Sequence, residues 1–291
     1  MLPFLLATRP KTLPAAIVPV WVGCVLAWKL TGRFDGLLCF CTVFGAICIQ
    51  IATNFFNDAI DAAKGADTEK RLGPQRVTAS GLMSRKAVMT CGGVFLLLAT
   101  ICGVVLIKAA GWPILAIGIP SLYFAYGYTG GPWPLAYRGL GELFVVIFFG
   151  LVAVTGTVFI QTQQWRWEAV LLGAQTGLLC TVLISINNLR DREEDSTTGK
   201  RTLAVRFGGK FARLVVLWEM KLAAFLGLFW FKFGHVSLAL SSLPMLTLGM
   251  AIDWFILTMP EGKKMNRLLA LSALQLVLFA VTFHLAAAKL P

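Results

Sequence analysis

Charged residues are scarce in this sequence of 291 residues. They make up only 14% of the chain, against 57% hydrophobic residues, whereas a typical soluble domain carries about 25% charged residues. No stretch of useful length alternates polar with apolar residues, which excludes a fold built on half-buried β-strands. The composition therefore predicts an all-α integral membrane protein, because helices satisfy their own backbone hydrogen bonds in lipid.

Histidine is nearly absent, and cysteine shows no metal-binding pattern. The chain has 2 His and 7 Cys, and its closest cysteine pair, Cys39 and Cys41, has no neighbouring His or third Cys. This excludes a zinc-type site built from sulfur and imidazole. We interpret the cysteines as small residues of the apolar core. A metal site in this chain must therefore rely on oxygen ligands.

Uncharged runs, in contrast, are long and numerous. Most of them reach the ~20 residues that a helix needs to cross the hydrocarbon core of a bilayer. These runs cover residues 36–57, 87–107, 109–137, 143–165, 169–189, 233–252 and 268–288. A shorter run at 12–28 and one at 214–231, interrupted by Glu219 and Lys221, raise the expected number of spans to about nine. We predict a single multi-pass domain over residues 1–291.

The net charge of +12 is distributed unevenly along the chain. If the N-terminus is cytoplasmic, 19 of the 26 Lys and Arg fall in cytoplasmic loops and 6 fall in loops of the other side. This asymmetry follows the positive-inside rule. The basic excess therefore indicates membrane topology and a lipid bilayer as partner, not nucleic acid. A bacterial inner membrane fits a multi-pass protein that shows no targeting extension.

The polar residues concentrate in two stretches that repeat one spacing. In the first stretch, residues 54–76, Asn57 and Asp61 lie four residues apart at the end of the second span. On a helix this spacing places both side chains on one face, one turn apart. Amides in the last turns of a span are costly in lipid, so they indicate partners inside the bundle.

The second stretch, residues 187–202, follows the sixth span. Its residues Asn187, Asp191 and Asp195 form a stripe at four-residue intervals. Because both stretches end even-numbered spans, they leave the membrane on the same face. We predict that they converge there into a polar, metal-binding cap.

The ligand types in these stretches favour Mg²⁺, with Mn²⁺ as the alternative ion, because all of them are hard oxygen donors. Mg²⁺ is commonly held by a few carboxylates together with substrate phosphates. The Arg and Lys of the same stretches add positive charge for a diphosphate. Apolar spans beneath the cap would hold a long hydrocarbon and keep water from an allylic cation.

In these motifs the chain resembles the UbiA superfamily of membrane-embedded aromatic prenyltransferases, which have nine spans and two Asp-rich motifs after the second and sixth. The usual first motif is N-D-x-x-D-x-x-x-D. Asn57, Asp58 and Asp61 match it, but Gly65 stands at the last Asp position and Asp67 follows two residues later.

This variant is similar to the branch that prenylates 1,4-dihydroxy-2-naphthoate in menaquinone biosynthesis. The segments R-P-K-T-L from Arg9, Y-x-G-L-G-E from Tyr137 and N-N-x-R-D-x-x-x-D from Asn187 fit the same branch. The resemblance implies Mg²⁺-dependent transfer of a polyprenyl group from a polyprenyl diphosphate to the naphthoate. CO₂ and diphosphate would leave, giving demethylmenaquinol or its oxidised quinone, demethylmenaquinone.

The resemblance also implies roles for individual residues. The metal ligands would be Asn57, Asp61, Asp67, Asp191 and Asp195, and the Gly65 departure leaves open whether Asp67 binds the metal or only orients the loop. The central catalytic residues would be Asp61, Arg76, Asp191 and Lys200, with Arg76 and Lys200 contacting the diphosphate and Asp58, Asn187 and Asn188 in support.

Position alone suggests further substrate-binding residues near the cap, namely Arg9, Asn54, Tyr128 and Arg138. Tyr128, Arg138 and Glu142 are the candidates for the acceptor side. For Tyr128, membership of an interfacial aromatic belt is the competing interpretation.

Other functions stay open at this point. Within the same fold the acceptor could be another aromatic compound, such as 4-hydroxybenzoate, homogentisate or haem. A different class, an ion-coupled transporter, would place its acids near the bilayer midplane, whereas here they gather at one face. A scaffold that binds nothing would leave the repeated Asn-x-x-x-Asp spacing unexplained. Mg²⁺-dependent binding of diphosphate separates the prenyltransferase from both.

Overall fold

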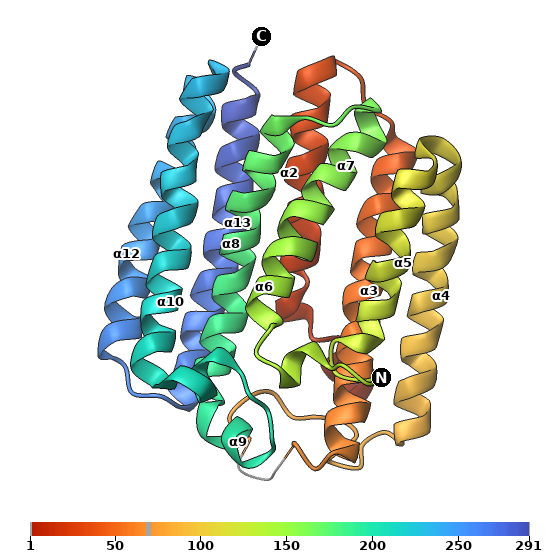
Figure 1. Cartoon of the computed structure of the whole chain (residues 1–291), viewed down its shortest axis with the longest axis vertical. Coiled ribbons are helices and arrows are strands. Elements are labelled where there is room, and N and C mark those ends of the chain that lie inside the picture. The colour runs from red at the N-terminus through yellow and green to blue at the C-terminus, as the bar shows by residue number, and fades with distance from the viewer. Residues whose placement is uncertain (1, 68–70, 291) are drawn as a thin grey trace.

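The protein folds into a bundle of α-helices that stand side by side (Figure 1). The computed structural model describes residues 2–67 and 71–290, and no strand occurs in these two ranges. Within these two ranges, eight helical segments are long and apolar enough to cross a membrane. The protein is therefore an all-α, multi-pass membrane protein, as the composition predicts.

The spans follow the uncharged runs of the sequence closely. Five are simple or nearly simple helices: α2 (Pro14–Thr31), α3 (Gly36–Ala63), α4 (Arg85–Ala110), α8 (Trp167–Arg190) and α13 (Asn266–Ala287), the last preceded by η5 (Lys263–Met265). Three are composite: α6 (Gly141–Val145) with η3 (Val146–Val152) and α7 (Ala153–Thr162); α10 (Leu203–Gly227) with η4 (Leu228–Phe233); α11 (Val236–Leu240) with α12 (Leu243–Thr258). The shorter α5 (Trp112–Gly127) stands where the fourth span is expected.

Local capping chemistry sets where several spans begin and end. Asp35 accepts a hydrogen bond from the backbone N–H of Leu38 (2.9 Å) at the start of α3. Thr202 does the same for α10 through the N–H of Val205 (3.3 Å). Such oxygens satisfy backbone donors that have no partner within the helix. The caps place the polar loops outside the spans.

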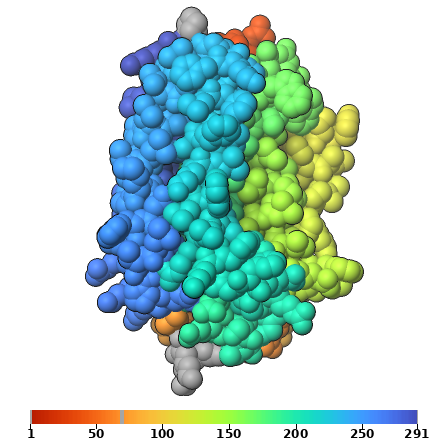
Figure 2. All heavy atoms as spheres, turned by 60° about the vertical axis from the view of Figure 1, so that its left-hand side comes forward, coloured from red at the N-terminus to blue at the C-terminus, as the bar shows by residue number. Residues whose placement is uncertain are grey.

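The outer surface of the bundle is apolar, the reverse of a soluble protein. α10 and α12 lie beside each other on the face seen in Figure 2. On these helices Trp218 is 69% exposed, Met250 66% and Trp254 67%. Large apolar side chains exposed in such number mark a surface made for an apolar partner, which for a multi-pass protein is the lipid.

One span is irregular where it meets α8. Residues 146–152 form a π-helix, η3, and its Gly150 packs against Gly173 and Gly177 of α8. A Cβ atom on Gly177 would lie 2.8 Å from the carbonyl oxygen of Val146. The glycines therefore let the two backbones touch. π-helical turns are often found at functional sites, and here Phe148 of η3 lines the central cavity described below.

The loops that carry the two polar stretches lie at one end of the bundle. Residues 64–84 connect α3 to α4, and α9 (Arg192–Thr197) follows α8. Figure 1 shows α9 at the lower end, and the C-terminus at the opposite end. The prediction that both stretches leave the bundle on the same face is confirmed.

Candidate active site

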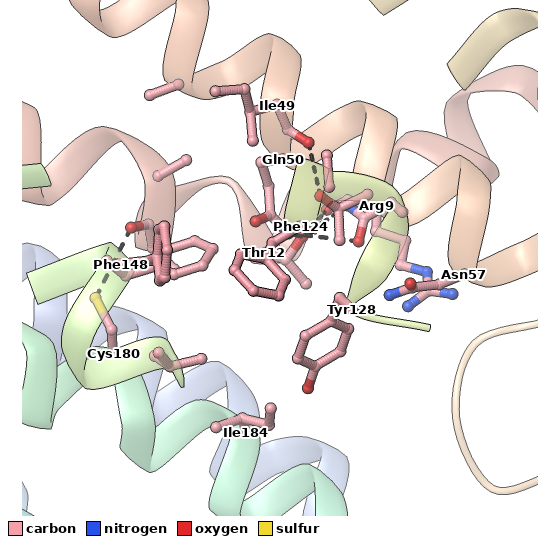
Figure 3. Close-up of a pocket in the computed structure, with 18 of the residues that line it drawn as sticks. Arg9, Thr12, Ile49, Gln50, Asn57, Phe124, Tyr128, Phe148, Cys180 and Ile184 are labelled. Atoms are coloured by element: carbon pink, nitrogen blue, oxygen red, sulfur yellow. Dashed lines mark hydrogen bonds between the residues drawn. The ribbon is translucent and has the colours of Figure 1, made fainter. Parts of the chain in front are cut away.

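A cavity of about 1390 Å³ opens between the helices beneath these loops. Its polar end is formed by residues of both polar stretches, including Asn57, Asp61, Asn187, Asp191 and Asp195. Its remaining walls are mostly apolar side chains of α3, α4, α5 and η3, such as Ile49, Ile114, Phe124 and Phe148 (Figure 3). The cavity therefore combines a charged mouth with a hydrocarbon-like interior.

Asp61 is the hub of the polar end. Its Oδ2 atom accepts hydrogen bonds from Nη2 of Arg76 (3.2 Å) and Nζ of Lys200 (3.1 Å). Its Oδ1 atom accepts one from the hydroxyl of Tyr137 (2.8 Å), which ends the short helix η2 (Leu135–Tyr137). Asp61 is almost fully buried. One carboxylate thus joins the first stretch to Lys200 of the second.

The loop after α3 is held by two further acids. Asp67 forms ion pairs with Arg71 and, at 3.2 Å, with Nε of Arg76. Burial raises the pKa of Asp67 to about 6, although Arg71 opposes the shift. Its Oδ2 atom is buried and has no partner among the described residues. Asp58 instead accepts hydrogen bonds from the backbone N–H groups of Val77 (3.1 Å) and Thr78 (2.9 Å), so it anchors the loop and does not line the cavity.

Arg190 organises the second stretch. Its guanidinium binds both oxygens of Asp191, at 2.7 and 2.5 Å, and the amide oxygens of Asn187 (2.8 Å) and Asn266 (2.7 Å). Asn266 in turn donates to the carbonyl of Leu72 in the first loop (3.0 Å). Sequence reasoning did not assign Arg190 to the site, although the residue stands inside the N-N-x-R-D motif. A planar guanidinium group can donate two parallel hydrogen bonds to one carboxylate, which makes such a bidentate ion pair strong and well oriented.

Lys200 lies between the two acidic stretches. Its Nζ atom is 3.1 Å from Asp61 and 3.8 Å from Asp195. Burial opposes its charge, but Asp61 and Asp195 together raise the pKa of Lys200. Burial raises the pKa of Asp195 to about 7, with Lys200 opposing and Asp191 adding to the shift. Lys200 is therefore cationic at neutral pH, whereas the carboxyl group of Asp195 gains or loses its proton close to pH 7.

The N-terminal segment adds a cation to the same cavity. Arg9 lies in the left-handed region at φ 51°, a conformation that non-glycine residues seldom adopt. Its Nη2 atom is buried without a partner among the described residues, and its side chain lies beside Asn57 (Figure 3). Burial, with some repulsion from Arg71, lowers the pKa of Arg9 to about 10, so it stays charged. Asn54 fixes the segment by donating to the carbonyl of Thr8 (3.0 Å).

The remaining predicted residues divide between the cavity and the surface. Tyr128 lines the cavity, and Asn188 lines it while donating a hydrogen bond to Glu142 (2.8 Å). Arg138 does not join them: its side chain is exposed and stacks on Trp133 at 3.9 Å. Tyr137, one residue earlier, joins the site instead through its hydrogen bond to Asp61, and it was not assigned to the site from the sequence.

The polar end supplies the oxygen donors of a divalent-metal site without forming a closed metal cage. In the described part of the chain no three acidic, His or Cys side chains come together as a ready cluster. Asp61, Asp67, Asp191 and Asp195 are instead each paired with an Arg or Lys. Hard oxygen donors that face one cavity, with cations between them, fit an ion held partly by substrate phosphates.

The sequence is similar to a known protein family and to several of its members. The model of the UbiA prenyltransferase family matches residues 16–283. A 1,4-dihydroxy-2-naphthoate octaprenyltransferase of Haemophilus influenzae is 37% identical over 214 residues, 71% of this chain and 69% of that protein. The protein of the same name from Mycobacterium tuberculosis is 39% identical over 210 residues, 71% of this chain and 70% of its own.

Solved structures show the same arrangement of helices at low sequence identity. A UbiA homologue from Archaeoglobus fulgidus bound to DMAPP and Mg²⁺ has a TM-score of 0.71 and 14% identity, covering 99% of each chain. An apo UbiA homologue from Aeropyrum pernix has a TM-score of 0.73 and 15% identity, covering 94% of this chain and 97% of that one. These similarities support the fold.

Proposed function

Because the chain belongs to the UbiA prenyltransferase family, we propose that it transfers a polyprenyl group from an allylic diphosphate to 1,4-dihydroxy-2-naphthoate. CO₂ and diphosphate leave, and the product is demethylmenaquinol, which gives demethylmenaquinone on later oxidation. Relatives of that activity at 37–39% identity support the acceptor. The observation that carries the proposal is one cavity with a cationic, oxygen-rich mouth and an apolar interior, which matches the two ends of a prenyl diphosphate.

The diphosphate binds at the mouth in this proposal. Asn57, Asp61, Asp191 and Asp195 would hold Mg²⁺, or Mn²⁺ in its place, and Asp67 would support them; when bound, the ion would neutralise charge on the phosphate oxygens. Lys200 and Arg76 are already ordered by Asp61. They exchange that carboxylate for phosphate oxygens and stabilise the charge that builds up as the C–O bond breaks.

The apolar interior receives the hydrocarbon chain. Phe124, Phe144 and Phe148 form a packed aromatic cluster in its wall, with ring centroids 4.3 Å apart for Phe144 and Phe148. The faces of aromatic rings carry partial negative charge and stabilise cations. The cluster therefore shields an allylic cation from water and lowers its energy.

The membrane orientation follows from the charge asymmetry of the loops. The end that carries both polar stretches also carries most of the Lys and Arg. We place this end, with the N-terminus, at the cytoplasmic face of a bacterial inner membrane. Water-soluble diphosphate head groups then approach from the cytoplasm.

A product assay tests the proposal. Purified protein in detergent receives 1,4-dihydroxy-2-naphthoate, farnesyl diphosphate and Mg²⁺, and products are identified by mass spectrometry. A prenylated, decarboxylated product is expected. Asp61→Ala and Asp191→Ala should reduce its formation by about 10² or more, because each removes a metal ligand and an acid that holds the neighbouring cations in place.

The matched control is Glu193→Ala, which removes an exposed acid two residues from Asp191 that does not line the cavity. It should behave as wild type. Product from 4-hydroxybenzoate alone would keep the prenyltransferase and replace the acceptor. Activity that survives chelation of divalent ions would contradict the metal-binding role of the two stretches.

A further inference from the structure

Glu142 is a buried carboxylate in the cavity wall that the binding of the diphosphate does not use. It lies in the first turn of α6 and is 7% exposed. One oxygen accepts a hydrogen bond from Nδ2 of Asn188 (2.8 Å), but Oε2 is buried without a partner among the described residues. An unsatisfied buried carboxylate oxygen costs free energy, so we expect a group of a bound ligand to be its missing partner.

The space around Glu142 suits an aromatic ring. The hydroxyl of Tyr128 lies against Gly141, since a Cβ atom there would be 2.9 Å from it and 3.2 Å from Cδ1 of Ile184. Figure 3 shows the Tyr128 ring reaching into the cavity with its hydroxyl toward Ile184. All three residues line the same cavity as Glu142. A flat acceptor placed here has a polar edge at Glu142 and apolar contacts on its faces.

We propose that Glu142 is a catalytic residue that accepts one proton from the aromatic acceptor and donates it back to the acceptor within the same turnover. Its Oε2 atom accepts a hydrogen bond from the acceptor's hydroxyl group that lies next to the acceptor's carboxylate. The inference rests on the proposed function, which supplies a hydroxyl beside a carboxylate that leaves as CO₂.

The step balances without a further reactant. The allylic C–O bond breaks and its electron pair leaves with diphosphate. The ring carbon that bears the carboxylate forms the new C–C bond, while the neighbouring hydroxyl becomes a ketone and its proton passes to Glu142. The C–CO₂ bond then breaks, its electron pair restores the aromatic ring, and the ketone oxygen takes the proton back from Glu142.

A buried site favours such a closed proton cycle, because no proton has to reach bulk water. The electrostatic neighbours of Glu142 include Tyr128, from the segment after α5, and Glu219 of α10. Its hydrogen-bond partners in the described part of the chain, the Asn188 amide and its own backbone N–H, are uncharged. Asp61 and Asp191, in contrast, are paired with cations and belong to the diphosphate end.

Glu219 provides a matched control. It too is buried, with one oxygen accepting from the hydroxyl of Ser185 (2.7 Å) and the other without a partner among the described residues. It does not line the cavity. A purely structural effect of removing a buried carboxylate would therefore affect both residues, whereas proton transfer to the acceptor needs Glu142 alone.

The test compares Glu142→Gln with Glu219→Gln, using farnesyl diphosphate, Mg²⁺ and 1,4-dihydroxy-2-naphthoate. Loss of a general base or acid commonly costs 10²–10⁴-fold, so we expect kcat of Glu142→Gln to fall by about 10²-fold or more. Binding of farnesyl thiolodiphosphate, an unreactive donor analogue, should stay unchanged. Glu219→Gln should keep its kcat within about threefold of wild type.

A modified acceptor gives a second readout. Methylating the hydroxyl next to the carboxylate removes the proton that Glu142 would take. Wild type and Glu142→Gln should then turn over this ether at the same low rate. Equal loss in Glu142→Gln and Glu219→Gln, or wild-type kcat in Glu142→Gln, would overturn the inference while leaving the proposed function intact. Absence of any prenylated naphthoate from folded wild-type protein would overturn both.

Discussion

At the scale of single residues, the polar end works by pairing opposite charges. Four acids, Asp61, Asp67, Asp191 and Asp195, each lie within 4 Å of an Arg or Lys nitrogen. Removing Asp191 would leave Arg190 buried without an acidic partner, which is more damaging than losing the pair, whereas Arg76 and Lys200 each contact two acids. The same pairing keeps the basic residues in place for an incoming phosphate.

The pKa of Asp195 predicts how metal binding depends on pH. Burial raises this pKa to about 7, so below pH 7 the carboxylate is mostly protonated, and a proton competes with a metal ion for it. Apparent Mg²⁺ affinity should therefore weaken as the pH falls from 8 to 6, by up to about tenfold per unit below the pKa.

Isothermal titration of the complex with farnesyl thiolodiphosphate measures this dependence. In Asp195→Asn the affinity should be lower at pH 8 and nearly flat between pH 8 and 6. An equally steep pH dependence in the variant would assign the titration to another group.

At the scale of helices, the contact between η3 and α8 leaves little room for any added side-chain atom. Gly177→Ala would bring a Cβ atom within 2.8 Å of the Val146 carbonyl oxygen and 2.9 Å of Cα of Gly150. Both are backbone atoms, which cannot yield as a flexible side chain would. We expect a loss of about 1–3 kcal/mol, the usual cost of overpacking, seen as a lower Tm in detergent.

Gly93→Ala on α4 is the control for this substitution. Nothing lies within 4 Å of a Cβ atom at Gly93, so Ala should be neutral or slightly stabilising there, as expected for an exposed helix position. Equal Tm values for the two variants would mean that the glycine contact does not constrain the two helices.

The helices were largely predictable from the sequence, because the surrounding lipid restricts which segments can form a span. Lipid requires about 20 apolar residues per span, and these runs are visible by inspection. The spacing of Asn57 with Asp61 and of Asn187 with Asp191 was visible too, because helical periodicity is local. The π-helix was not predictable, because nothing in the sequence of residues 146–152 distinguishes a π-helical turn from an α-helical one.

The contacts that assemble the site were harder to predict. Lys200 reaches Asp61 across 139 positions, and Asn266 meets Leu72 across 194. Such pairs depend on how loops fold over the bundle, for which no periodicity exists. For the same reason the sequence favoured Arg138 for the acceptor side, whereas the chain turns it outward and directs Tyr137 inward.

At the scale of the whole molecule, the charge asymmetry predicts a testable topology. Glu193 lies at the end that carries both polar stretches, and Gln164 lies in the connection between α7 and α8 at the other end. In a cysteine-free background, Glu193→Cys should resist a membrane-impermeant maleimide in intact spheroplasts and react after lysis. Gln164→Cys should react in both. The reverse pattern would contradict a cytoplasmic active face.

The pairing of acids with bases at the cavity mouth has a consequence for the order of loading. Four carboxylates face Arg71, Arg76, Arg190 and Lys200, and Arg9 adds one cation without a partner among the described residues, so the empty mouth is only weakly cationic. A prenyl diphosphate alone would add about three negative charges and Mg²⁺ alone two positive ones, each poorly tolerated where water is scarce. Arriving as one salt they nearly cancel. The mouth thus selects a metal–diphosphate complex over either ion by itself, and free diphosphate ester in excess of metal should behave as a weak competitor.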